Sequence, residues 1–314
     1  MPDARYTNGT NGTNGTNGTN GTNGTNGTAS KKVWLITGCS SGLGHAIALA
    51  ALQRGDIVVA TSRDASKLGS LAERGALTES LDVTSSDVAL SAAIEKIASR
   101  THGRIDVLVN NAGYILSGGV EECSRAEVEA AFGTNVFGQL NVLRAVLPLM
   151  RRQRSGVVAN MGSIGGWGGT PGAGIYCATK ACASLVSEAL RGEVAHLGIK
   201  VTAVEPGYTR TNFLTQGHHL RAANVIDDLR PGVEPTVNAL GAYSLKQPGD
   251  PDKLALLVVE ALTESGRCAG RKLPPRLLVG KDSYQIVGGS VDAHRANWKI
   301  WEDLATATNC DDAD

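Results

Sequence analysis

The stretch VWLITGCSSGLG, residues 33–44, joins a short apolar run to a turn that contains three glycines. The apolar run predicts a buried strand, and the residues behind it, HAIALAALQRG, have the spacing of a helix. Glycines at 38, 42 and 44 let the backbone turn tightly and approach a pyrophosphate, which a helix N-terminus attracts. Taken alone, the motif is also compatible with an ordinary strand–helix turn. Its place in the first strand–turn–helix unit favours dinucleotide binding.

The same alternation continues along the chain. Strand candidates follow at 56–63, 76–84, 105–113, 156–166 and 199–207, and helix candidates at 66–74, 87–103, 125–153 and 175–198. Strands that alternate with helices form right-handed βαβ units. We therefore expect residues 30–314 to form one domain of the α/β class, a Rossmann-like doubly wound parallel sheet flanked by helices. Ligands on such sheets bind beyond the carboxyl ends of the strands, where the glycine-rich and polar motifs fall.

The composition argues against several classes of partner. The 314 residues include 30 basic and 30 acidic side chains, so the net charge of zero favours neither nucleic acid nor an anionic membrane. No apolar run reaches the roughly 18 residues of a membrane span. The six cysteines show neither a C-x-x-C pair nor zinc-ligand spacing. We expect free thiols, no metal site and a cytoplasmic protein.

The first residues have a different character. Residues 8–28 repeat the triplet Asn-Gly-Thr and contain no apolar side chain to bury. We therefore predict that residues 1–29 are a disordered tail. Each triplet is formally an N-glycosylation acceptor, but no basic and apolar leader typical of secretion precedes it. We expect these acceptors to stay unmodified.

The end of the second strand candidate predicts the choice of cofactor. An acidic residue there would accept hydrogen bonds from the 2′-hydroxyl of an adenosine ribose. This chain has Ser62 at that position, followed by Arg63 and Asp64. A guanidinium suits a 2′-phosphate, and Asp64 is expected to cap a helix rather than face the ribose. The pattern favours NADP(H) over NAD(H).

Three polar residues around the fifth strand candidate suggest an acid–base device. Tyr176 and Lys180 lie about one helical turn apart and share a face. A phenol with a pKa of about 10 is a poor base near neutrality, and a nearby ammonium can lower that pKa by roughly 1–3 units. Ser163, at the strand end, can donate a hydrogen bond to a carbonyl oxygen on which negative charge develops. The Tyr–Lys spacing alone is also typical of a solvated helix face, and the glycine-rich turn upstream favours the chemical interpretation.

With these motifs the sequence resembles the short-chain dehydrogenase/reductase family. The motifs, in family order over residues 33–211, are TGCSSGLG (37–44), NNAG (110–113), GTNVFG (133–138), Ser163, YCATK (176–180) and PGYTRT (206–211). The later segments PGDPDKLALLVVEAL and PPRLLVGKDS are similar to the subgroup of hydroxysteroid- and retinol-dehydrogenase-like oxidoreductases.

The resemblance implies a catalytic tetrad of Asn135, Ser163, Tyr176 and Lys180. Tyr176 is its general acid/base, and Ser163 positions the reacting oxygen. Lys180 binds the nicotinamide ribose and lowers the tyrosine pKa, while Asn135 holds a water of a proton relay. Together with Arg63, the residues expected to bind or support the cofactor are Gly38, Ser40, Ser41, Gly42, Leu43, Gly44, Asp82, Val83, Asn110, Ala112, Gly113, Tyr176, Lys180, Pro206, Gly207, Thr209 and Thr211. Thr209 departs from the family, which usually has an aliphatic residue there.

Residues 213–249 break the strand–helix alternation, and we predict that they form an irregular lid over the nicotinamide. His218 and His219 are expected to face solvent rather than to act in catalysis or metal binding. Trp167 is expected in the pocket wall or, alternatively, packed in the lid or a subunit contact. Cys177 and Cys182 are expected to be packing residues rather than a redox pair.

The predicted function is that of an NADP(H)-dependent oxidoreductase acting on a medium-sized, largely apolar ketone or secondary alcohol. Two alternatives stay open: a nucleotide sensor, and a protein that uses the same pocket for isomerisation or cyclisation control. The intact tetrad argues against both. In the family, helices such as 125–152 and 175–197 commonly form a two-fold interface, so a homodimer or homotetramer is expected.

Overall fold

A parallel sheet organises the protein, of which the computed structural model describes residues 31–215 and 217–310. The predicted tail 1–29 lies outside these residues. Seven strands of the described chain form the sheet, and in spatial order they are β3 (Leu77–Ser80), β2 (Ile57–Ser62), β1 (Val33–Ile36), β4 (Val107–Asn110), β6 (Gly156–Met161), β7 (Ile199–Pro206) and β9 (Arg276–Val279). The predicted doubly wound α/β fold is confirmed. β9 is a strand that the sequence analysis did not predict.

The order of the strands places the binding crevice. β1 pairs in parallel with β2 on one side and with β4 on the other, so the direction of winding reverses between β1 and β4. Loops that leave such a switch point diverge and open a crevice at the carboxyl ends of the strands. The glycine-rich turn follows β1, and the segment NNAG includes the end of β4. Both motifs therefore lie at the crevice.

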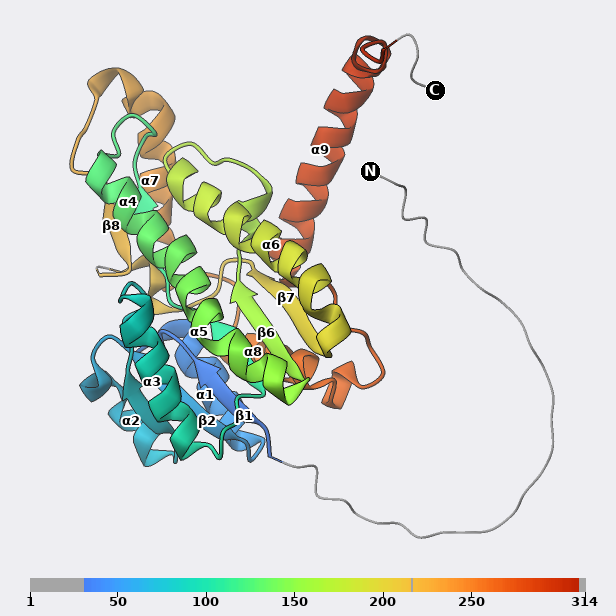
Figure 1. Ribbon diagram of the computed structural model, residues 1–314. Coiled ribbons are helices and arrows are strands. Elements are labelled where there is room, and N and C mark those ends of the chain that lie inside the picture. Colours follow the sequence, from blue (N-terminus) through green and yellow to red (C-terminus); the bar gives the residue numbers. More distant parts are fainter. Residues whose placement is uncertain (1–30, 216, 311–314) are drawn as a thin grey trace, which may run out of the picture. The chain divides into compact units, whose positions relative to one another are not determined.

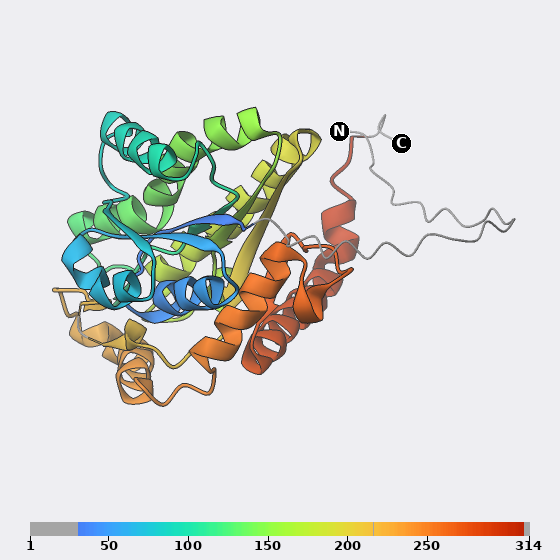
Figure 2. The same cartoon turned by 90° about the horizontal axis from the view of Figure 1, so that it is seen from below.

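Helices cover both faces of the sheet (Figures 1 and 2). Those on one face are α1 (Gly42–Gln53), α2 (Gly69–Glu73) and α8 (Pro251–Thr263), and those on the other are α3 (Asp87–Arg100), α5 (Gly138–Gln153) and α6 (Gly174–Val194). Successive strand residues serve opposite cores: Trp34 packs into the first apolar cluster and Leu35 into the second, each fully buried. Burial on both faces explains why the strands read as continuous apolar runs.

The predicted helix 125–153 contains an irregularity. It begins as α4 (Arg125–Phe132), widens into a π-helical turn at Gly133–Phe137 and continues as α5. A capping box formed by Ser124 and Glu127 starts the helix. π-Helical turns frequently mark functional sites because the extra residue re-aims the side chains around it. This turn carries Asn135.

The prediction of an irregular lid at 213–249 was wrong in part. The segment contains β8 (His219–Arg221), which pairs in parallel with β5 (Ile115–Ser117), and the helix α7 (Arg230–Tyr243). The carboxylate of Glu122 ties the segment down by accepting hydrogen bonds from the backbone N–H groups of Gly119 and Ile226. Those long-range contacts stabilise short elements whose own sequences carry little periodicity.

The last helix, α9 (Lys281–Thr306), has two different halves. Ser283 and Val287 in its first turns are buried against the sheet domain. Figure 1 shows the second half running on beyond the neighbouring elements, and residues 292–310 are exposed. Neither α9 nor any other helix within the described ranges combines the length and apolar character needed to cross a bilayer.

Candidate functional site

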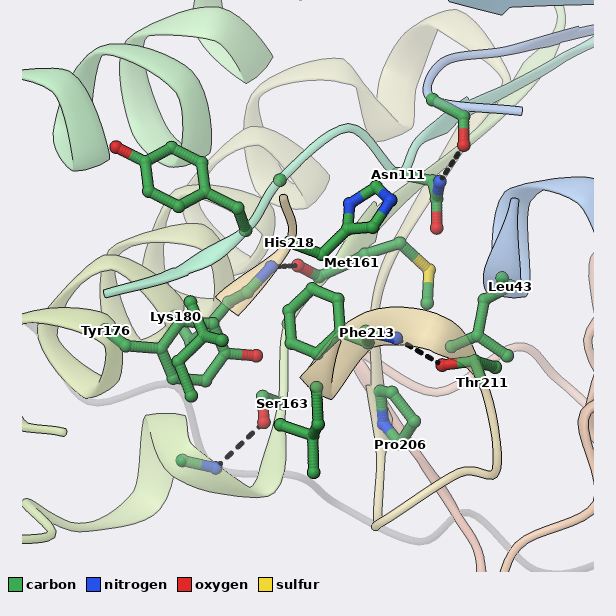
Figure 3. A pocket seen from close by; sticks show the side chains of 18 of the residues that line it. Leu43, Asn111, Met161, Ser163, Tyr176, Lys180, Pro206, Thr211, Phe213 and His218 are labelled. Carbon is green, nitrogen blue, oxygen red and sulfur yellow. Dashed lines mark hydrogen bonds between the residues drawn. The ribbon is translucent and has the colours of Figure 1, made fainter. Parts of the chain in front are cut away.

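A cavity of about 630 Å³ lies at the carboxyl ends of the strands, beside the switch point. It extends from the glycine-rich turn to α6 and the lid (Figure 3). The predicted site residues that line it are Gly38, Ser40, Ser41, Gly42, Leu43, Arg63, Asp82, Val83, Ala112, Gly113, Ser163, Tyr176, Lys180, Pro206, Gly207, Thr209 and Thr211. Three predicted residues, Gly44, Asn110 and Asn135, lie behind this lining.

The glycine-rich turn needs its glycines for conformation and for space. Gly38 and Gly42 have φ angles of +70° and +63°, which side chains disfavour. A Cβ at Gly44 would lie 2.4 Å from Nδ2 of Asn111, so this glycine serves close packing behind the turn rather than ligand contact. The turn is therefore shaped before any ligand arrives.

Asn111, which the sequence analysis passed over, locks that turn. Its Nδ2 donates hydrogen bonds to the carbonyl oxygens of Thr37 (2.9 Å) and Gly38 (3.0 Å), and its backbone N–H donates to Thr37 Oγ1. The predicted cofactor residue Asn110 instead points into the sheet, where its Nδ2 donates to Asn160 Oδ1. Consecutive residues at a strand end face opposite ways, so one position of NNAG supports the sheet and the next supports the turn.

The end of β2 places two of the residues considered for cofactor choice at the border of the cavity. Arg63 is exposed and borders the cavity, and the buried Ser62 also borders it. Asp64 caps the following 3₁₀ turn and accepts a hydrogen bond from the backbone N–H of Ser66. The expected role of Asp64 as a helix cap is confirmed.

Ser163 and Tyr176 come together at the far end of the cavity. Ser163 ends the segment after β6, and its Oγ accepts a hydrogen bond from the backbone N–H of Gly165 (3.1 Å). A Cβ at Gly165 would contact both Ser163 Oγ and a ring carbon of Tyr176, each at 3.6 Å, so the two side chains flank this glycine. Figure 3 shows both hydroxyls pointing into the same space, with the ring of Phe213 beside them.

The electrostatics of the pair differ from the sequence prediction. Burial lowers the pKa of Lys180 from 10.5 to about 8, and its Nζ donates a hydrogen bond to Met161 O (2.8 Å). The same Nζ lies 5.8 Å from the centre of the Tyr176 ring. Burial raises the pKa of Tyr176 above 10, and the hydroxyl of Ser163 offsets only part of that effect. The expected lowering was wrong in direction, because desolvation of the buried phenol is the largest influence on its pKa.

Asn135 acts as a tie between segments. Its Oδ1 accepts a hydrogen bond from the N–H of Tyr114 (3.0 Å), while its Nδ2 donates to Tyr114 O (2.9 Å) and to Thr179 Oγ1 (3.1 Å). The π-helical turn thus joins the segment after β4 to the helix that carries Tyr176 and Lys180. The water-holding role of Asn135 stays a prediction.

The two lid histidines are partly buried and hydrogen-bonded rather than solvent-facing as predicted. His218 borders the cavity, and its Nε2 is hydrogen-bonded with Ser41 Oγ across 3.2 Å. His219 Nε2 is hydrogen-bonded with Ser117 Oγ at 2.7 Å, beside the β5–β8 pairing. Burial lowers the pKa of both imidazoles. His218 therefore connects the lid to the glycine-rich turn.

The cavity wall nearest Ser163 is apolar, and hydrogen bonds from buried residues hold it in place. Trp167 lines the cavity, and its Nε1 donates a hydrogen bond to the fully buried carboxylate of Glu205 (2.7 Å). The same carboxylate accepts from Ser184 Oγ, and the guanidinium of Arg276 lies 4.5 Å from the centre of the Trp167 ring. This buried network, which the sequence analysis did not predict, holds one side of the pocket in place.

The cysteines are all free, in agreement with the prediction. Cys177 is buried and borders the cavity, whereas Cys182 is partly exposed, and neither is in a disulfide. Within residues 31–215 and 217–310, no group of three or more His, Cys, Asp or Glu side chains is placed to hold a metal ion.

Comparisons with known proteins point the same way as this geometry. A family model described as short chain dehydrogenase matches residues 32–219. Oxidoreductase BOA17 of Botryotinia fuckeliana (strain B05.10) is 36% identical over 282 residues, which are 88% of this chain and 99% of that protein. A crystal structure of a short-chain dehydrogenase from Streptomyces avermitilis has a TM-score of 0.81 and 39% identity, covering 90% of this chain and 99% of that one. The closed form of serine dehydrogenase complexed with NADP+ has a TM-score of 0.63 and 27% identity, covering 79% and 94%.

Proposed function

The chain belongs to the short-chain dehydrogenase family of oxidoreductases, and from that premise we propose that it transfers a hydride between NADP(H) and a ketone or secondary alcohol. One observation carries the proposal. Ser163, Tyr176 and Lys180 line the cavity that begins at the glycine-rich turn, so acid–base groups and a dinucleotide cradle share one space.

The glycine-rich turn and the first turn of α1 have the chemistry that binding a dinucleotide requires. The first turn of α1 contains no acidic residue, and the side chain of its N-cap, Ser41, makes no capping bond. The backbone N–H groups of that turn are thus available to a diphosphate, which the helix dipole favours. Gly38, Gly42 and Ala112 carry little or no side chain, so the part of the cavity beside the turn stays open. When bound here, the nicotinamide supplies or accepts the hydride.

Tyr176 is the proton donor in the direction of reduction. Its raised pKa keeps the phenol protonated at neutral pH, as a general acid requires. Ser163 donates a hydrogen bond to the same carbonyl oxygen, and charge that develops there is stabilised in a water-poor site. Lys180, with a pKa of about 8, is mostly protonated at neutral pH and contributes positive charge beside the phenol.

The choice of NADP(H) rests on the end of β2. Arg63 borders the cavity, while Asp64 is engaged as a cap and does not oppose a 2′-phosphate. Arg63→Ala should therefore weaken NADPH binding about 10-fold or more and NADH binding only slightly, because a charge-assisted hydrogen bond is worth roughly 1.5–3 kcal/mol. Arg74→Ala, which removes an exposed guanidinium outside the cavity lining, is the matched control. Equal losses for both cofactors would contradict the assignment.

The substrate end favours an apolar compound of medium size. The lining beyond Ser163 and Tyr176 is largely apolar and includes Ile115, Trp167, Phe213, Leu214, Leu240 and Ile286. A phosphorylated or sugar substrate would need converging basic groups or many hydrogen-bond partners. A panel of apolar ketones and alcohols should give turnover, and a preference for phosphorylated compounds would contradict this choice.

The assembly we propose is a homodimer or homotetramer through the long helices. Two large apolar side chains on these helices, Phe137 in the π-helical turn and Leu185 on α6, are 55% and 59% exposed and would be covered by such an interface. Sedimentation of the active protein at the mass of a single chain would remove this part of the proposal.

The central test is Tyr176→Phe. Removing the hydroxyl should lower kcat by at least 1,000-fold, near the upper range of general acid catalysis, while NADPH still binds. Tyr208→Phe is the control, because Tyr208 also borders the cavity but lies outside the proposed acid–base group. Near-normal turnover of Tyr176→Phe would overturn the mechanism. NADPH binding without consumption over the whole panel would favour the nucleotide sensor, and an isomerised or cyclised product without consumption would favour non-redox chemistry.

A further inference from the structure

The second half of α9 presents large apolar side chains that the described chain does not cover. Trp298 and Trp301 are 66% and 64% exposed, and residues 292–310 are exposed throughout. Figure 1 shows this half of α9 standing clear of the sheet and its helices. Two neighbouring tryptophans at such exposure are a common sign of an interaction surface.

The apolar positions of α9 follow the spacing of a coiled coil. A stripe in which successive members are alternately three and four residues apart runs through Tyr284, Val287, Val291, His294, Trp298, Trp301 and Ala305. Val287 in this stripe is buried in the domain, whereas Tyr284, in the first turn of the same helix, is 65% exposed. The ring of His294 stacks on Trp298, with centroids 6.1 Å apart. The stripe therefore continues as a helix-binding seam beyond the domain.

We propose that this seam, residues 291–305, pairs with the same seam of a second copy in an antiparallel, two-fold arrangement. Arg295 and Glu302 lie beside the seam at equivalent heptad positions, on the same flank. In an antiparallel pair each Arg295 faces Glu302 of the other copy, and the symmetry makes this contact twice. In a parallel pair the corresponding flanking contacts would join Arg295 to Ser290 and Glu302 to Asn297, with no opposite charges. The charges therefore select the antiparallel pair.

The charge of the segment argues against a lipid surface. Between 292 and 306 the acidic residues are Asp292, Glu302 and Asp303, and the basic ones are Arg295 and Lys299. Helices that lie on membranes carry an excess of lysine and arginine on their polar face. This helix carries no such excess, whereas its two flanking charges complement a second copy of itself.

The size of the contact predicts association that depends on concentration. Four buried tryptophans, two from each copy, supply roughly 600–1,000 Å² at about 150–250 Å² each. Stable complexes bury about 1,200–2,000 Å². Leu304, which is 63% exposed beside the seam, adds to the area. We expect the two seams to associate with moderate affinity, whether or not another interface also joins the chains.

The helix that carries the seam also contacts the wall of the cavity. Ser290 Oγ donates a hydrogen bond to Trp167 O (2.8 Å), and Ile286 borders the substrate end of the cavity. Pairing of the seams would therefore hold in place a helix that forms part of the pocket wall.

The first test compares masses of the full-length chain by light scattering over a range of concentrations. The variant Trp298→Ser/Trp301→Ser should show half the wild-type mass at the concentrations where the wild type is associated. Ile300→Ser is the matched control, since Ile300 is 70% exposed on the opposite face of the same segment, and its mass should equal that of the wild type. Circular dichroism checks that each variant keeps its fold.

The second test reverses the flanking charges. Arg295→Glu and Glu302→Arg should each halve the mass, whereas the double variant and a 1:1 mixture of the two single variants should restore it. Masses that are equal for the wild type and the tryptophan variant, or charge reversals without effect, would overturn the proposal. So would flotation of the wild type, but not the tryptophan variant, with anionic phosphatidylserine vesicles, because that result would assign the seam to a membrane.

Discussion

Removing the buried ammonium of Lys180 should change how the stability of the protein depends on pH. Lys180 is 4% exposed, and burial lowers its pKa from 10.5 to about 8. Between these two pH values the unfolded chain holds a proton that the folded chain has released, so the free energy of unfolding rises with pH. The difference amounts to about 3 kcal/mol over the whole window at 1.36 kcal/mol per pH unit. From pH 7 to pH 9 the wild type should gain about 1.4 kcal/mol relative to Lys180→Met.

The assay is urea unfolding of the cofactor-free protein at pH 7 and pH 9, for wild type and variant. The double difference removes the titration of other groups, and the phenol of Tyr176, whose pKa is raised above 10 in the fold, stays largely protonated between pH 7 and pH 9. Lys253→Met, which removes an 84% exposed lysine, should behave like the wild type. Equal pH dependence for wild type and Lys180→Met would refute the reasoning, because it would mean that Lys180 is not desolvated in the folded state.

Three further predictions test the supports of the site. Gly207→Ala should destabilise the fold by about 1–3 kcal/mol in a denaturation assay, because its Cβ would fall 2.1 Å from an oxygen of Asp282. The displaced carboxylate is the one that accepts a hydrogen bond from the backbone N–H of Tyr208. Gly288→Ala, whose Cβ would have nothing within 4 Å, should not destabilise the fold in the same assay. Glu205→Leu should cost about 3–5 kcal/mol by leaving its buried donors unpaired, and a loss no larger than that of Glu205→Gln would contradict the network. A thiol reagent should modify the exposed Cys310 first in the native protein and reach all six cysteines only after unfolding; rapid modification of a buried cysteine without unfolding would argue against the packing.

The parts of the fold that could be predicted are those governed by local pattern. Buried parallel strands read as apolar runs, and glycines with positive φ mark the turn, so the sheet and the Gly38–Gly42 turn were both predictable. The helix α7 was not, because it begins after a segment rich in charges and contains Pro235, and it is stabilised by burial of Val237 and Leu240. Long-range packing decides such an element.

In the site, too, features set by local sequence pattern were predictable, and features set by long-range packing were not. Most residues predicted from motifs do line the cavity, whereas the different roles of Asn110 and Asn111 depend on which way each side chain points. The direction of the Tyr176 pKa is set mainly by desolvation, and spacing along a helix carries no information on how deeply a phenol is buried. The link between Trp167 and Glu205 joins segments far apart in the chain and has no local signal.

The lock that Asn111 places on the glycine-rich turn has a consequence for the order of folding. The hydrogen bond from Asn111 to Thr37 O joins residues 74 positions apart. Closing a loop of that length costs conformational entropy that contacts within the first strand–turn–helix unit do not offset. The turn therefore acquires its final shape only when β4 docks beside β1, and a peptide containing β1 and α1 alone would hold a dinucleotide poorly. Conversely, a dinucleotide that binds the finished turn stabilises the contact between distant parts of the chain, so it should raise the melting temperature of the entire sheet.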